Sequence, residues 1–187
     1  MKKTANNYRL LGIDPGTNVL GFAIIEIKNK QASMIDLGII TMGKYQDHHD
    51  KLKEIFESLQ QVIKNYHPTV MAIEAPFYGK NVQSMLKLGR AQGVAIAAGM
   101  MMGLEIAEYS PKKIKQSVTG NGNASKEQVM AMLEQILKVK LADFSLDATD
   151  ALATAVCHHF QSNSVLGKGK RYGDWGSFLK DNPDRIK

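Results

Sequence analysis

The feature that most constrains the fold is the segment 11–17 (LGIDPGT), in which an apolar run ends abruptly at an acid. Residues 8–13 are apolar and bulky enough to form a β-strand, and Pro15-Gly16 is a turn signal that ends it. A second strand over residues 19–27 follows at once. Asp14 is therefore expected at a strand end, either as a hydrogen-bonded turn residue or as a ligand for a cation.

Three more acids occupy comparable positions. Residues 69–74 form a short apolar run that ends at Glu74, just before another proline turn. Much later, Ser145 is a helix N-cap, and the spacing of Asp147 and Asp150 puts both on one helix face, about 60° apart. For Asp147 alone, the open alternative is a first-turn charge that stabilises the helix dipole.

Four carboxylates on apolar elements would repel one another unless a divalent cation lay among them. Oxygen ligands without a cysteine or histidine partner favour Mg²⁺ or Mn²⁺ over zinc. His48, His49 and His67 lie at the edges of a polar helix and are expected to be exposed to solvent. The single cysteine, Cys157, is expected to be a small core residue and excludes a disulfide framework.

The remaining elements follow from periodicity and turn chemistry. Residues 19–27 and 32–41 are expected to form a hairpin. A helix with apolar residues at helical spacing ends before Pro68, and Ser125 with Gln128 has the form of a capping box. The other elements expected are a long helix over 82–103, a strand over 105–109, a helix from Ser110-Pro111 and one from Ser125 to about 139.

Four motifs together resemble the RuvC family of Holliday-junction resolvases: residues 12–17 (GIDPGT), 73–77 (IEAPF), 88–94 (LGRAQGV) and 147–153 (DATDALA). The match runs in order over about residues 8–160. It implies an α/β fold of the RNase H-like type, a five-stranded mixed sheet flanked by helices. The family's four catalytic, metal-binding acids would fall on Asp14, Glu74, Asp147 and Asp150.

The resemblance implies a homodimer that uses two Mg²⁺ ions, with Mn²⁺ as a substitute, to cut opposed strands of four-way junction DNA. Asp14 is expected to bridge the two ions, and Asp150 to be the weakest ligand. Phe77 is expected to stack on bases at the junction centre. The branch-migration motors RuvA and RuvB are candidate partners.

Small residues on one face of the long helix, Gly89 and Gly93 among them, permit a close approach by another backbone. That approach is either to the sheet or, as the resemblance implies, to the same helix of a second subunit. Cations around the acids are candidates for DNA binding, because they could offset the carboxylates near a phosphodiester. They are Lys80, Lys87, Arg90, Lys112, Lys115 and Lys126.

A net charge of +6 and a pI near 9.3 favour a polyanionic partner. Half of the excess positive charge lies in residues 161–187, which hold six Lys or Arg against three Asp. We therefore expect a nuclease domain over residues 1–160 and a basic, flexible tail over 161–187. Without a signal segment or an apolar run of membrane-spanning length, the chain is expected to be cytoplasmic.

Three other functions remain open alternatives. A RuvC-like nuclease that processes ribosomal RNA would share the fold, and a non-catalytic junction-binding dimer would not need all four acids. Actin-like sugar kinases also have an Asp-x-Gly-Thr loop after a strand. They need two such lobes, for which 187 residues are too few.

Overall fold

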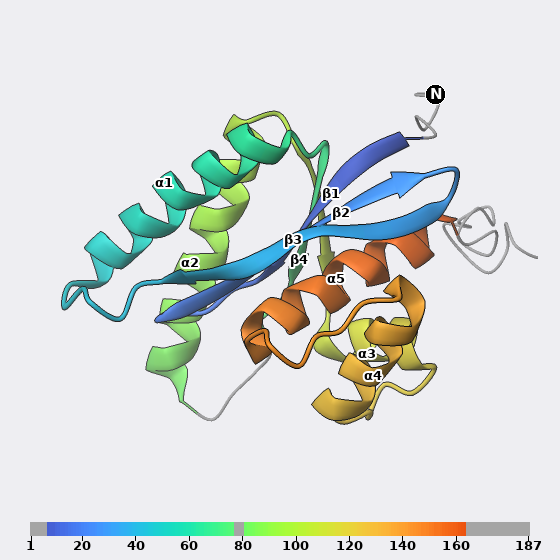
Figure 1. Ribbon diagram of the computed structural model, residues 1–187. Coiled ribbons are helices and arrows are strands. Elements are labelled where there is room, and N and C mark those ends of the chain that lie inside the picture. Colours follow the sequence, from blue (N-terminus) through green and yellow to red (C-terminus); the bar gives the residue numbers. More distant parts are fainter. Residues whose placement is uncertain (1–6, 77–80, 164–187) are drawn as a thin grey trace, which may run out of the picture.

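The computed structural model describes residues 7–76 and 81–163. Within these ranges the chain forms five strands and five helices (Figure 1). In chain order they are β1 (Asn7–Asp14), β2 (Val19–Lys28), β3 (Gln31–Thr41), α1 (His48–Tyr66), β4 (Val70–Glu74), α2 (Val82–Met101), β5 (Glu105–Tyr109), α3 (Pro111–Thr119), α4 (Lys126–Leu137) and α5 (Leu146–Asn163).

The strands form one mixed sheet in the order β3-β2-β1-β4-β5. The first three strands pair antiparallel as a meander, whereas β4 pairs parallel to β1 and β5 pairs parallel to β4. The two parallel pairings require crossover connections, which α1 and α2 supply. The predicted five-stranded mixed sheet is therefore confirmed.

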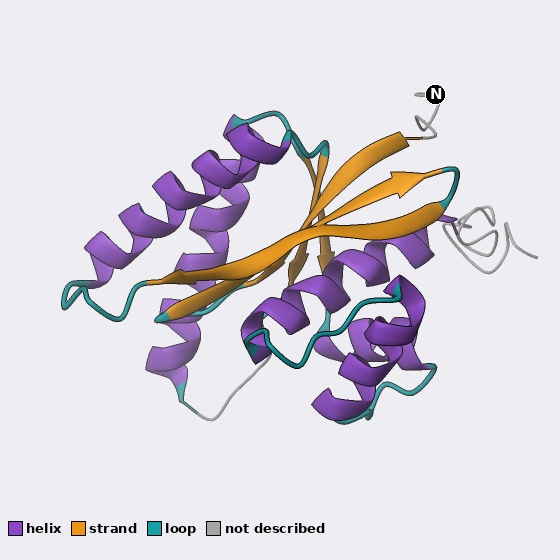
Figure 2. Cartoon of the chain, viewed as in Figure 1, coloured by secondary structure: helices purple, strands orange, loops and turns teal. Residues whose placement is uncertain are grey.

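Helices cover both faces of the sheet (Figure 2). Alternate strand residues point to opposite faces, so Leu10 joins the core beneath α3, α4 and α5, while Leu11 and Ile13 join the core beneath α1 and α2. All three side chains are fully buried. Two separate apolar cores on a central sheet hold its strand ends in fixed positions.

Helix ends agree closely with the signals in the sequence. The side chain of Ser110 accepts from the backbone of Lys113 at the start of α3, and both hydrogen bonds of the capping box that begins α4 are present. Helix α1 ends because His67 adopts a left-handed conformation with φ of 51°. Helices α2 and α4 each end two residues earlier than expected, and Lys138 takes the same left-handed conformation after α4.

Helix α5 lies directly against β1 and β2 because glycines leave room for its backbone. A Cβ added at Gly12 would clash with the main-chain oxygen of Ala151, and one at Gly21 would clash with that of Asp147. Both glycines therefore allow a close approach between strand and helix. This contact positions the first two turns of α5 over the strand end that carries Asp14.

The described part of α5 continues three residues past the expected domain boundary at residue 160, and the rest of the predicted tail lies outside the described residues. No helix in the described ranges is long and apolar enough to cross a membrane.

Candidate active site

Two acids lie side by side at one end of the sheet. Asp14 is the last residue of β1 and Glu74 is the last residue of β4. These strands are parallel, and Ile13 pairs with Ile73, so the two acids follow equivalent positions on neighbouring strands. The sheet topology thus brings together two residues that are 60 positions apart in the chain.

The other two acids come from the first two turns of α5. Asp147 is partly buried, and its main-chain oxygen lies against Gly21, the cross-strand partner of Asp14. Asp150 lies one turn further on, and its Oδ2 is 2.5 Å from the Nζ of Lys126. The helix therefore adds two carboxylates on the face that approaches Asp14.

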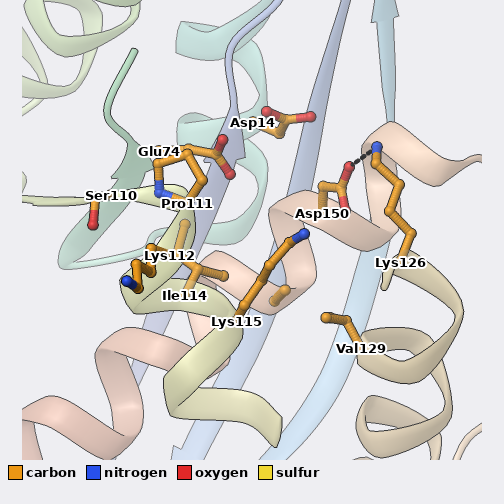
Figure 3. A pocket seen from close by; sticks show the side chains of 11 residues that line it. Asp14, Glu74, Ser110, Pro111, Lys112, Ile114, Lys115, Lys126, Val129 and Asp150 are labelled. Carbon is orange, nitrogen blue, oxygen red and sulfur yellow. Dashed lines mark hydrogen bonds and ion pairs between the residues drawn. The ribbon is translucent and has the colours of Figure 1, made fainter. Parts of the chain in front are cut away.

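A pocket of about 660 Å³ opens between these elements, and three of the four acids line it: Asp14, Glu74 and Asp150. Lys115 from α3 and Lys126 from α4 extend toward the carboxylates from the opposite wall (Figure 3). Apolar side chains also line the pocket and form its apolar wall, namely Ile114, Val129 and Ala153. Asp147 does not line the pocket, although its charge acts on Asp14.

Burial and the charges of neighbouring acids favour the protonated forms of Asp14 and Glu74. Burial, followed by the charges of Glu74, Asp150 and Asp147, raises the pKa of Asp14 to about 8. Burial and the charge of Asp150 raise the pKa of Glu74 to about 7, although Lys126 and Lys115 act to lower it. The hydrogen bond to Asp150 raises the pKa of Lys126, which therefore stays charged.

The carboxylate groups of this site are suitable ligands for a divalent cation. In the described ranges, no three His, Cys, Asp or Glu side chains converge closely enough to form a ready set of ligands. The raised pKa values of Asp14 and Glu74 nevertheless indicate that negative charge is unfavourable at this site. A bound cation would stabilise the ionised carboxylates. Carboxylate oxygens are the ligands that Mg²⁺ and Mn²⁺ prefer.

Of the other predicted DNA-binding residues, some line this pocket and some do not. Lys112 lines it, and its side chain packs against Gly122 in the glycine-rich turn before α4. Lys87 and Arg90 lie on exposed positions of α2 instead. Phe77 and Lys80 lie outside the described residues.

Gly89 and Gly93 do not pack on the sheet. A Cβ added at either position would meet no atom within 4 Å, so both glycines face open space. Of the two alternatives for this face of α2, packing against the sheet is therefore wrong. The helix contacts the sheet through other residues, including Gly99, which packs against Met71.

Two residues that position the site were missed by the sequence reasoning. Gln92 is buried in α2, and its Nε2 donates to Oε2 of Glu108 at 2.8 Å and to the main-chain oxygen of Glu74 at 3.5 Å. A buried amide in an apolar helix was the available signal. Gly21 is the other, and the signal was a glycine inside a strand.

Comparison with known proteins places this site in a family. The family model described as the crossover junction endodeoxyribonuclease RuvC matches residues 10–158. The chain belongs to the RuvC family. Its relatives of that name include the protein from Cytophaga hutchinsonii, 58% identical over 95% of this chain and 88% of the relative. The protein from Bacteroides fragilis is 49% identical over 95% of both chains.

A solved RuvC structure has the same fold. RuvC of T. thermophilus, in complex with Holliday junction substrate, is 28% identical, with a TM-score of 0.77 over 83% of this chain and 94% of that chain. The RNase H-like fold is therefore confirmed, as is the predicted family. The chain is an enzyme of a metal-dependent endodeoxyribonuclease family, which argues against the alternatives of ribosomal RNA processing and of a sugar kinase.

Proposed function

We propose that this RuvC enzyme resolves Holliday junctions by paired nicks in opposed strands, during DNA recombination and repair in the cytoplasm. The observation that carries the proposal is the pocket in which Asp14, Glu74 and Asp150 face Lys115 and Lys126. The T. thermophilus relative bound to Holliday junction substrate supports the choice of DNA. A pocket with both carboxylates and cations suits a phosphodiester that is held and hydrolysed in the same place.

In this proposal, Asp14, Glu74, Asp147 and Asp150 would hold two Mg²⁺ ions, for which Mn²⁺ could substitute, and Asp14 would be the central ligand. When bound, the ions would activate a water and stabilise the leaving 3′ oxygen, which leaves a 5′-phosphate and a 3′-hydroxyl. Asp150 is held by Lys126 and is therefore the least available of the four.

The lysines act on the DNA itself. Lys115 and Lys126 bring positive charge to the phosphodiester, which would otherwise meet a cluster of acids. The apolar wall of Ile114, Val129 and Ala153 restricts water on one side and strengthens these charge interactions. Lys112 extends the cationic surface along α3. Contacts from Phe77 and Lys80 stay a prediction.

We further propose that two subunits pair through α2, so that two pockets can cut opposed strands. Apolar or small residues that are exposed, or half-buried in the case of Gly89, follow one face of this helix along its length: Val82, Leu86, Gly89, Gly93, Ala97 and Met100. A monomer rarely leaves such a continuous apolar stripe in water. Docking of RuvA and RuvB on the dimer stays a prediction.

Incubation of the purified protein with Mg²⁺ and a four-way junction labelled on each arm tests the proposal. Wild-type protein should nick two opposed strands and leave ends that a ligase can reseal. Asp14→Asn should reduce the cleavage rate by at least about 10³-fold but should still bind the junction. The variant loses a metal ligand but keeps Lys115 and Lys126. Cleavage by Asp14→Asn at the wild-type rate would contradict the site assignment.

A further inference from the structure

A second pocket of about 310 Å³ lies near the active site, where the turn between β1 and β2 meets the first turns of α1 and α2. Its lining is almost entirely polar. The residues are Thr17, Asn18, Gln46, His48, Lys51, Ser84 and Lys87. Neither the predicted metal ligands nor the apolar wall of the active site contributes to it, so this pocket is a separate feature.

Positive charge is concentrated around this pocket. Lys51 and Lys87 line it from two different helices, and Arg90 lies near enough to act on the charge of His48. The Nζ of Lys51 donates to Oδ1 of Asn18 at 2.7 Å, which ties the lysine to the turn that follows Asp14. Lysines that surround a concave surface create a stronger positive potential there than lysines that extend singly into water.

No acid is among the described residues that line this pocket. Asp47 is the N-cap of α1, where its Oδ1 accepts from the backbone of His49 and is 2.9 Å from the Nδ1 of the same residue. It does not line the pocket. Both α1 and α2 begin here, and the N-terminal end of a helix dipole also favours an anion.

His48 provides an independent observation. It was expected to be solvent-exposed, but its Nε2 is buried and has no hydrogen-bond partner among the described residues. A buried polar atom without a partner is unfavourable, so a ligand that hydrogen-bonds to Nε2 would stabilise this position. Burial, then the charges of Arg90 and Lys87, lower the pKa of His48, and a bound anion would reverse the effect of these charges.

We propose that this pocket binds a backbone phosphate of the junction DNA, beside the phosphate that is cut. The proposal rests on the proposed function, because the anion is then part of the substrate. Thr17 is three residues after Asp14, so their Cα atoms are within about 11 Å of each other. This upper limit is at most about three base steps of 3.4 Å along the helix axis, so one DNA strand can reach both sites.

Salt dependence of junction binding provides the test. Full-length wild type and the variants Lys51→Met, Lys87→Met and His48→Asn are titrated with a fluorescent four-way junction at several salt concentrations, with EDTA present to prevent cleavage. Lys53→Met is the matched control, because Lys53 lies on the exposed face of α1, near Glu57 and outside the pocket. Melting temperatures show that each variant is folded.

Loss of one phosphate contact reduces the slope of log K against log salt by about 0.9. We expect this decrease for Lys51→Met and for Lys87→Met, weaker junction binding for His48→Asn, and wild-type behaviour for Lys53→Met. If the pocket lysines behave like Lys53→Met, the proposal is wrong. If the variants show these reduced slopes but wild type does not cut the junction when Mg²⁺ replaces EDTA, the proposed function is contradicted while the pocket is supported.

Inorganic phosphate distinguishes DNA from a free anion as the occupant. Phosphate is titrated into the free protein and into the protein–junction complex, and the NMR signal of the His48 ring is followed. Competition, in which the junction prevents the phosphate-induced shift, supports a DNA phosphate in the pocket. A phosphate-induced shift that is unchanged by the junction would mean that the pocket serves a free anion, which would overturn the proposal.

Discussion

Asp14 and Glu74 hold their protons more tightly than ordinary carboxyls, because both are buried beside other acids. A carboxyl whose pKa is raised on folding stabilises the folded state fully below its unfolded pKa of about 4, and that contribution is lost as the pH rises through the folded value. The folded values are about 8 and about 7. The metal-free protein should therefore lose stability between about pH 4 and pH 8.

Thermal melting in EDTA at several pH values measures this effect. Asp14→Asn removes one of the two groups, so its melting temperature should fall less with pH and exceed that of wild type near pH 8. Each 1 kcal/mol corresponds to about 2–4 °C for a chain of this size. Mg²⁺ should raise the melting temperature of wild type more than that of the variant. Identical pH profiles for the two proteins would contradict the charge cluster.

Lys126 is expected to support cleavage more than folding. Its ion pair with Asp150 is half-exposed and contributes little to stability. Its charge, however, faces the carboxylates and any phosphodiester among them. Lys126→Met should reduce the cleavage rate about 10²-fold, in the range seen when one electrostatic contact is lost from an active site. Single-turnover cleavage measures the loss, and Lys126→Arg should restore part of the rate.

The positions of single acids were predictable from the sequence, but their surroundings were not. Turn residues placed Asp14 and Glu74 at strand ends, and helix spacing put Asp147 and Asp150 on one face. The sequence could not show that Asp150 pairs with Lys126, or that His48 is buried at Nε2. Both depend on contacts between elements that are distant in the chain.

At the scale of elements, the contact between α5 and the sheet decides whether the four acids meet. Gly21→Ala would place a methyl group against the main-chain oxygen of Asp147, so α5 must move away from β2. Overpacking of this kind costs about 1–3 kcal/mol. We expect a lower melting temperature and a cleavage rate reduced at least about tenfold, because Asp147 and Asp150 move with the helix.

Gly43→Ala is the matched control, since a Cβ at Gly43 meets no atom within 4 Å. It should cut junctions at the wild-type rate. Wild-type stability and activity in Gly21→Ala would show that α5 does not depend on this close approach for its position.

Most elements were predictable because their signals are local. Capping residues, turn residues and alternating apolar positions predicted the five strands and the ends of several helices to within a few residues. Less predictable was the face of α2 that contacts the sheet. Gly89, Gly93 and Gly99 all permit close approach, and only the folded chain shows that Gly99 meets the sheet while the other two face outward.

On the scale of the whole molecule, the roles proposed for the two pockets and for the apolar stripe of α2 complement one another. The proposed active site lies at the shared end of β1 and β4, and the second pocket lies just beyond Asp14, where α2 begins. Lys87 lines the second pocket, and Gly89, two residues later, belongs to the stripe. Residues two apart on a helix point in nearly opposite directions, so pairing through the stripe would leave the second pocket open to DNA.

Gly93→Glu separates dimer formation from folding. A Cβ at this position contacts no other atom within 4 Å, and replacing a helical glycine by glutamate should stabilise the helix itself by about 0.5–1 kcal/mol. The same charge would be buried without a partner if Gly93 lies in a subunit interface. We therefore expect a folded monomer by sedimentation velocity, whereas wild type and Gly43→Glu sediment as dimers. The monomer should lose paired nicks in opposed strands. A Gly93→Glu protein that remains dimeric, or a wild type that is monomeric, would contradict pairing through α2.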